Sequence, residues 1–336
     1  MTATSIGSIG DLALRHGGRL RDAKLAYVTY GTLAPDGRNA VLLTHGYTSS
    51  HLFADDGQAE GSWAPLVGPG RAIDTDKLFV VSSNMLGSSY GSTGPASLDP
   101  ATGRPYGPDF PPITLGDIVG AQRRLLEQLG VRELVAVVGP SYGGFQAFAW
   151  GLEFPELVRA IVPVTTAPRM AGGIAVESLR ARMSADPRWR SGRYEPGAMI
   201  DTMTAIRQDT LRRYGIEAML AARTADPSER AATLYAVARA WAEVFDPHSL
   251  LVLGAAANEF DATQSYLRIR ARVLFILSTT DALFPPTLAP EVMSGLRAAG
   301  VDATYQELES PYGHLAPGAD AAKWAPALTR FLAGLA

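Results

Sequence analysis

The chain has 336 residues, of which 47% are hydrophobic and 19% charged, and it contains no cysteine. This composition is typical of a globular protein with a large core, and the lack of thiols excludes disulfides, cysteine nucleophiles and thiolate metal sites. The formal net charge of −3 provides no basic field that would attract nucleic acid.

The five histidines never occur at the H-x-x-x-H or H-E-x-x-H spacing of zinc sites, so we expect no metal site. The N-terminal residues lack the basic and then apolar pattern of a signal peptide. No apolar run approaches the length of a membrane span. We therefore expect a cytoplasmic protein that binds neither a membrane nor nucleic acid.

The first part of the chain alternates β-like and helical segments. Two β-like stretches on either side of Gly17-Gly18 predict an antiparallel hairpin. Short apolar runs then predict buried strands, and apolar residues at helical spacing predict a helix that ends at Gly130. These elements cover 12–14 and 25–30 for the hairpin, 40–44 and 78–83 for the buried strands, and 114–130 for the helix. A loop rich in glycine, serine and proline, 84–112, precedes the helix.

The next segment predicts a strand, a sharp turn and a helix. The apolar run 134–138 ends at the sequence G-P-S-Y-G-G (139–144), and helical character resumes at 145–152. The pattern G-x-S-x-G often occurs by chance, but between a strand and a helix it predicts a nucleophile elbow with Ser141 at its apex. The flanking glycines fit a strained turn that passes close to neighbouring chain.

The second half of the chain predicts a helical insertion and then a return to the sheet. A short strand at 160–165 is followed by 172–266, which has helical spacing and no β-like run. The remaining predicted elements are a strand at 272–278, a helix at 290–299, a strand at 303–308 and a closing helix at 319–335. We therefore predict a core formed by residues 1–171 and 267–336, with 172–266 inserted as a helical lid.

The succession of strand, helix and strand predicts an α/β protein with a mostly parallel central sheet and flanking helices. Ser141, Asp281 and His314 each follow a predicted strand, and their order is that of the nucleophile, acid and base of the α/β-hydrolase fold. Because parallel strands open at one edge of the sheet, the three side chains can converge there. We predict that they form a catalytic triad.

Each of these assignments has an alternative. Asp281 could be a helix N-cap before the proline-rich turn. Glu307 or Glu309 could be the acid, although both lie at a poor angle to orient the histidine. His314 could be an ordinary surface histidine. The backbone N–H groups of Tyr142 and Tyr47 are the expected oxyanion donors, whereas the alternative for the turn that contains Tyr47 is a plain β-turn.

Several stretches resemble the homoserine O-acetyltransferase family of α/β-hydrolase proteins. They are 67–87, 91–111, 143–150, 281–286 and 313–314. The resemblance implies the α/β-hydrolase fold, the triad Ser141, Asp281 and His314, and a homodimer formed through the lid helices.

The chain also departs from this family's pattern. The family's elbow commonly reads G-G-S-M-G-G or G-G-S-F-G-G, so Tyr142 is a difference. Leu315 follows the histidine where the family usually has an aspartate that could face a substrate ammonium. The lid arginine that pairs with the substrate carboxylate in acetyltransferases aligns with Thr202, and Arg207 follows one and a half turns later. Unpaired charges in a dry pocket are costly, so these differences argue against homoserine as the substrate.

Three functions remain in view. The first is hydrolysis of an ester or a related small acyl substrate through an acyl-Ser141 intermediate, without any cofactor. The second is acyl transfer from acetyl-CoA or another acyl-CoA to an alcohol. The third is a catalytically silent binding protein on the same scaffold. The differences at Thr202 and Leu315 favour hydrolysis over transfer.

Overall fold

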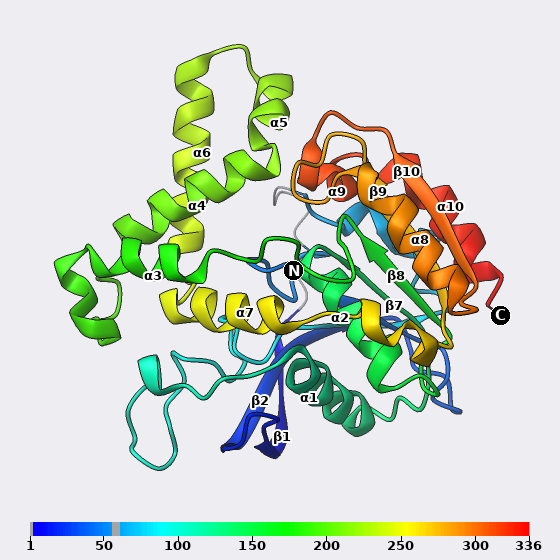
Figure 1. The fold of residues 1–336 in the computed structure, drawn as a ribbon, viewed down its shortest axis with the longest axis horizontal. Coiled ribbons are helices and arrows are strands. Elements are labelled where there is room, and N and C mark those ends of the chain that lie inside the picture. The colour runs from blue at the N-terminus through cyan, green and yellow to red at the C-terminus, as the bar shows by residue number, and fades with distance from the viewer. Residues whose placement is uncertain (1–2, 56–60, 336) are drawn as a thin grey trace.

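The computed structural model describes residues 3–55 and 61–335. Its centre is an eight-stranded sheet with the strand order β1-β2-β6-β3-β7-β8-β9-β10 (Figure 1). The strands are β1 Ser5–Ala13, β2 Arg19–Tyr30, β3 Ala40–Thr44, β6 Phe79–Ser83, β7 Leu134–Pro140, β8 Ala160–Val164, β9 Arg272–Ser278 and β10 Ala303–Leu308. β2 pairs antiparallel with β1 and β6, and the pairs from β6 to β10 are parallel. The predicted mostly parallel sheet is confirmed.

The central strands are buried on both faces, which explains why they read as continuous apolar runs. The first hairpin is the largest departure from the predicted elements. Its first strand extends over Ser5–Ala13 rather than 12–14, because its glycines and exposed polar residues hide the strand pattern. The turn at Gly17-Gly18 has positive φ at both glycines, as a tight hairpin requires.

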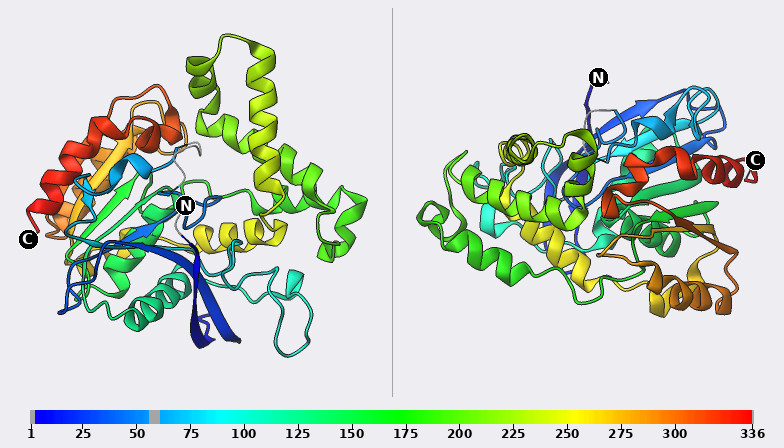
Figure 2. Two further views of the ribbon diagram at one scale, coloured as in Figure 1. Left: turned by 180° about the vertical axis from the view of Figure 1, so that it is seen from behind. Right: turned by 90° about the horizontal axis from the view of Figure 1, so that it is seen from above.

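Helices cover both faces of the sheet. One face packs against α1 Leu115–Gln128, α2 Tyr142–Glu153 and α8 Ala289–Ala298, and the other against α10 Ala321–Ala333. The right-hand view of Figure 2 shows α8 and α10 on opposite sides of the strands. Side chains alternate along each strand, so that Leu42 enters one core and Leu43 the other.

Two helix ends show how the sequence determines the boundaries. Thr114 caps α1 by accepting from the N–H of Asp117, and the Asp117 carboxylate accepts from the N–H of Thr114 in return. The predicted closing helix at 319–335 corresponds to α10, and the single turn α9, Ala316–Ala319, precedes it. Trp324 fixes this corner, because its indole N–H donates to the carbonyl of Pro317 at 2.8 Å.

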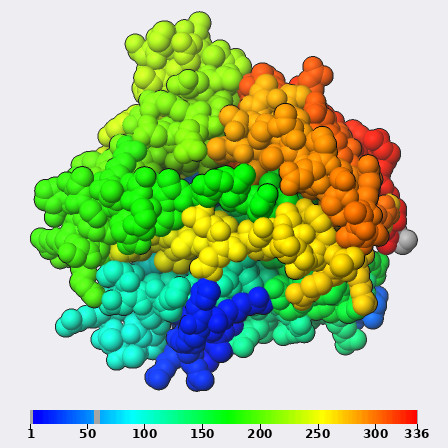
Figure 3. All heavy atoms as spheres, viewed as in Figure 1, coloured from blue at the N-terminus to red at the C-terminus, as the bar shows by residue number. Residues whose placement is uncertain are grey.

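The segment between β8 and β9, here called the helical segment, contains five α-helices among its described residues. They are α3 Val176–Ser184, α4 Ile200–Tyr214, α5 Ile216–Arg223, α6 Pro227–Ala242 and α7 Pro247–Glu259. In Figure 3 its green atoms lie on the left of the molecule, opposite the red C-terminal atoms, and its yellow atoms cross the face to meet the orange ones. The segment has apolar clusters of its own, built around Met203 and Trp241 in one and Leu211 and Leu220 in the other.

Across the described part of the chain, no helix combines the length and the apolar character needed to cross a membrane.

Candidate active site

Ser141 occupies a strained turn between β7 and α2. Its backbone has φ 56° and ψ −120°, a region that residues other than glycine rarely adopt. The N–H of Ser141 donates to the carbonyl of Val164 at 2.8 Å, and the hydroxyl of Thr166 donates to the Ser141 carbonyl at 2.8 Å. These bonds from the neighbouring chain hold the turn in this conformation.

The glycines of the elbow are required by the adjacent strand β3. A Cβ atom at Gly139 would lie 2.1 Å from the Thr44 hydroxyl oxygen, and one at Gly143 would lie 2.2 Å from the Thr44 carbonyl oxygen. At Gly144 a Cβ would lie 2.2 Å from the Thr166 side chain. The sequence-based reason for these glycines, close passage of neighbouring chain, therefore matches the structure.

Asp281 and His314 come from the ends of β9 and β10 and meet at hydrogen-bond distance. The Nδ1 atom of His314 lies 2.8 Å from Oδ2 of Asp281. The other carboxylate oxygen accepts from the N–H groups of Leu283 and Phe284, at 2.8 and 3.3 Å. No helix begins at Asp281, so it is not a helix N-cap; its carboxylate accepts from the turn that follows and also contacts the imidazole.

The carboxyl group of Asp281 is kept ionised by its partners. Burial raises its pKa, but the charge of His314 and the hydrogen bonds from His314, Leu283 and Phe284 together outweigh burial. The pKa of Asp281 therefore lies below its usual value. A carboxylate at this position holds the Nδ1 proton and leaves Nε2 free to act as a base.

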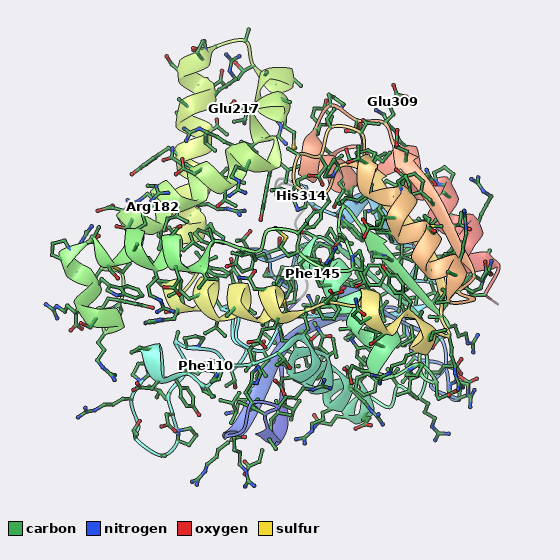
Figure 4. All side chains as sticks on the ribbon, in the orientation of Figure 1. Phe110, Phe145, Arg182, Glu217, Glu309 and His314 are labelled. Atoms are coloured by element: carbon green, nitrogen blue, oxygen red, sulfur yellow. The ribbon has the colours of Figure 1, made fainter. Side chains whose placement is uncertain are left out.

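The two glutamates considered as alternative acids are both exposed. Glu307 accepts from the hydroxyl of Tyr305 at 3.1 Å. Glu309 lies at the outer edge of the molecule, whereas His314 lies toward its centre (Figure 4). His314 is 7% exposed and packs against the rings of Tyr214 and Phe284, so it is no surface histidine.

Ser141 lies where two cavities meet. The first, of about 320 Å³, is lined by Ser141 and His314 together with Thr48, Arg207 and Tyr214. The second, also about 320 Å³, is lined by Ser141 with a different set of side chains, several of them apolar: Phe145, Met170, Ile174, Leu179, Leu283 and Phe284. Arg182 and Arg213 contribute to its wall. Two partners can therefore approach the serine from different sides.

The residues expected to supply oxyanion donors flank this junction. Tyr142 is the first residue of α2, where a backbone N–H has no acceptor within its own helix. Tyr47 follows Gly46 just beyond the end of β3 and lines both cavities. The two tyrosine rings are stacked, with centroids 5.8 Å apart and planes 9° from parallel.

Arg207 reaches the first cavity, and Thr202 does not line it. The guanidinium of Arg207 donates to the Thr48 hydroxyl at 2.6 Å and lies over the Trp241 ring at 5.2 Å. Thr202 instead donates to Asp186 at 2.6 Å. The chain therefore has no arginine at the Thr202 position, as expected, and the cavity-facing cation of α4 is Arg207, one and a half turns later.

The sequence analysis also left out Tyr214 and Tyr90, which line the same cavity. Arg207 and Tyr214 are seven residues apart, which places them on one face of α4. This helical spacing was the feature of the sequence that could have shown that the two residues face the same cavity. Burial raises the pKa of Tyr90 to about 12, against the opposing effect of Arg207. Both phenols therefore keep their protons, since burial also raises the pKa of Tyr214.

Comparison with known proteins identifies the family. A model of the alpha/beta hydrolase fold matches residues 39–318. The homoserine O-acetyltransferase of Symbiobacterium thermophilum is 39% identical over 332 residues, covering 90% of this chain and 87% of that protein. The chain belongs to the homoserine O-acetyltransferase family of the α/β-hydrolase superfamily. The resemblance inferred from the sequence motifs is confirmed.

Other members of this family and fold have different names. The homoserine O-succinyltransferase of Leptothrix cholodnii is 35% identical, over 94% of this chain and 91% of that protein. The crystal structure of esterase E22 superposes with a TM-score of 0.89 and 28% identity, over 99% of this chain and all of the other. This member of the homoserine O-acetyltransferase family is therefore an α/β-hydrolase enzyme with transferase and esterase relatives.

Proposed function

We propose that this enzyme is an O-acyltransferase that passes a short acyl group from acyl-CoA, through Ser141, to the hydroxyl group of a small alcohol that carries a carboxylate. The observation that carries the proposal is the position of Arg207 in the cavity that Ser141 and His314 share. A guanidinium that lines a cavity beside the nucleophile suits a carboxylate, which it can bind through charge-assisted hydrogen bonds. The transferases that are 35–39% identical to the chain support the same assignment.

The proposed reaction has two halves. In the first, Nε2 of His314 removes the proton of the Ser141 hydroxyl, whose oxygen attacks the thioester carbonyl while Asp281 steadies the imidazolium. The N–H groups of Tyr47 and Tyr142 bind the oxyanion, the C–S bond breaks, and the thiolate takes the proton from His314. In the second half His314 deprotonates the acceptor hydroxyl, whose oxygen attacks the acyl-serine carbonyl. The bond between the acyl carbon and the Ser141 oxygen then breaks, and this oxygen takes the proton back from His314.

The two cavities give each substrate a side of its own. We assign the acceptor to the cavity that contains Arg207, and the acyl donor to the second cavity, which contains Arg182 and Arg213. The wall of the second cavity carries Arg213, for which the described residues provide no ion pair, and Arg182, which pairs with Asp209 at 2.7 Å. A cationic wall suits a donor with phosphate groups.

Ester hydrolysis is the second candidate, and one observation favours it. Leu315, the residue after His314, lines the acceptor cavity with Leu52, Phe53 and Trp63, so much of that wall is apolar. An apolar wall suits the alkyl part of a simple ester, with water as the acceptor. The likeness to esterase E22 supports this reading.

One experiment separates the two candidates. Thiol release from acetyl-CoA is measured with and without homoserine and other hydroxy acids, and p-nitrophenol release from p-nitrophenyl acetate is measured in parallel. Thioester cleavage that depends on the acceptor and yields the O-acetyl product supports transfer. Rapid ester cleavage to acetate, with no acceptor effect on either reaction, supports hydrolysis instead.

Ser141→Ala is the control for both candidates. Both predict that it loses activity and labelling by a fluorophosphonate. A wild-type protein that cleaves neither substrate and resists the label would leave only the silent binding protein.

A further inference from the structure

The two expected oxyanion residues are both fastened to one helix of the helical segment. The hydroxyl of Tyr47 donates to the carbonyl of Leu250, and the hydroxyl of Tyr142 donates to the carbonyl of Leu253 at 3.1 Å. Both acceptors belong to α7, which runs toward the N-terminal end of α2 in Figure 1. One helix therefore receives a hydrogen bond from each side of the proposed oxyanion site.

The Tyr142 contact is buried and the Tyr47 contact partly buried, and both have a fixed direction. Tyr142 is 1% exposed, and burial raises the pKa of both tyrosines well above the usual value. Each hydroxyl therefore stays protonated and can donate. A helix carbonyl has two lone pairs, so Leu250 and Leu253 can accept from a tyrosine as well as from their own helix.

Helix α7 is shaped to receive this pair. Gly254 lies inside α7, where glycine costs about 1 kcal/mol relative to alanine. A Cβ atom at this position would lie 2.9 Å from the Tyr47 hydroxyl, and about as close to Val176 and Ile174. The helix thus carries an unfavourable residue where the tyrosine approaches.

A further contact ties the same loop to the helical segment. The indole N–H of Trp241, on α6, donates to the carbonyl of Thr48 at 2.9 Å. Thr48, the residue after Tyr47, is therefore also held by a hydrogen bond from α6. The peptide between Gly46 and Thr48 has its position set by the helical segment as much as by the sheet.

We propose that the hydroxyl groups of Tyr47 and Tyr142 are positioning groups, which set the two backbone oxyanion donors by fastening both residues to α7. The inference rests on the proposed function, because it requires an oxyanion at Ser141. Donors of this kind act only at the position where charge develops, so a small displacement lowers the rate without weakening substrate binding. The Tyr142 hydroxyl is a feature of this chain, since the family commonly has methionine or phenylalanine there.

The test removes each hydroxyl with its ring kept, as Tyr47→Phe, Tyr142→Phe and the double variant. We expect kcat to fall about 10-fold in each single variant and further in the double variant, because the loss of a whole donor costs about 100-fold or more. KM should stay within about 2-fold, and the affinity for a boronic acid that mimics the tetrahedral state should fall in step with kcat.

Tyr194→Phe is the matched control. Tyr194 donates to Asp246, the N-cap of α7, at 2.7 Å, so its loss loosens the same helix without touching either oxyanion residue. It should keep the kcat of the wild type. An equal loss of kcat in Tyr194→Phe, or wild-type kcat in the double variant, would overturn the proposal.

Gly254→Ala provides a variant with all hydroxyls intact. The new methyl group crowds the Tyr47 hydroxyl, so kcat should fall while KM stays unchanged. Because alanine also favours the helix, the melting temperature should fall less than the loss of kcat would suggest. Unchanged kcat and boronic acid affinity in a folded Gly254→Ala protein would contradict the coupling. If Ser141→Ala retained activity, the proposed function would fail instead, whatever the tyrosine variants do.

Discussion

The ring of Tyr214 lies 4.8 Å, centroid to centroid, from the ring of His314 and is tilted 47° from it. Tyr214 is the last residue of α4, the helix that also places Arg207 in the cavity. The helical segment thus contacts the proposed base directly and supplies the cation of the acceptor cavity. The chemistry proposed here belongs to the interface between the sheet and this segment.

Arg207→Gln should weaken the binding of substrates that carry a carboxylate. A hydrogen bond to a charged group contributes about 1.5–3 kcal/mol, so KM for such an acceptor should rise about 10- to 100-fold. The KM for p-nitrophenyl acetate, which has no carboxylate, should change much less. Thr202→Val is the matched control, since this hydroxyl contacts Asp186 and should leave both values unchanged. Equal KM changes for both substrates would contradict a carboxylate site.

Asp281→Asn should abolish most of the turnover with the fold intact. The amide can still accept from the N–H groups of Leu283 and Phe284, but it no longer stabilises an imidazolium. The corresponding change in a well-studied triad lowers kcat about 10⁴-fold, and we expect about 10³- to 10⁴-fold here, measured by steady-state kinetics with circular dichroism as the fold control. Glu309→Gln should keep wild-type kcat, and a large loss in that variant would favour the alternative acid.

The sequence predicted the elements that carry strong local signals. The elbow glycines, the helix that ends before Gly130 and the apolar central strands have their causes within a few residues, so they could be predicted from the sequence. The order of Ser141, Asp281 and His314 could be read because each follows a strand end. Fold class and candidate site therefore followed from the pattern.

What the sequence missed depends on contacts between distant segments. The packing of α4 determines which of its residues face the cavity. Alignment alone therefore could not show whether Thr202 or Arg207 lines it. The bonds from Tyr47 and Tyr142 to α7 join residues 203 and 111 positions apart. Local pattern carries no information on such pairs.

Gly143→Ala should destabilise the elbow, because the new methyl group would overlap the Thr44 carbonyl oxygen. Overpacking of this kind costs about 1–3 kcal/mol, measured as the free energy of unfolding in urea. The matched control is Gly120→Ala in α1, where a Cβ meets no atom within 4 Å. That change should instead stabilise the protein by about 1 kcal/mol, because alanine favours the helix. An unchanged free energy of unfolding in Gly143→Ala would show that β3 can move away from the elbow.

Acid should weaken the fold through His51, a histidine that is only 1% exposed. Burial, and to a smaller extent His45, lower the pKa of His51 to about 4. In the unfolded chain the usual value is about 6.5, so the unfolded state binds the proton first as the pH falls. The stability that the neutral ring contributes is complete above pH about 6.5 and is lost progressively down to about 4. Within this window the free energy of unfolding should fall by about 1.4 kcal/mol per pH unit on account of His51.

Urea titrations across that window test the assignment, with His51→Gln as the comparison. Glutamine does not titrate and can still reach the Thr4 hydroxyl, which lies 2.9 Å from Nε2 of His51. The variant should therefore show a shallower pH dependence between about 6.5 and 4 than the wild type, and the two curves should run parallel above that range. Identical slopes in the two proteins would mean that the ring of His51 takes up its proton in the folded state as readily as in the unfolded chain.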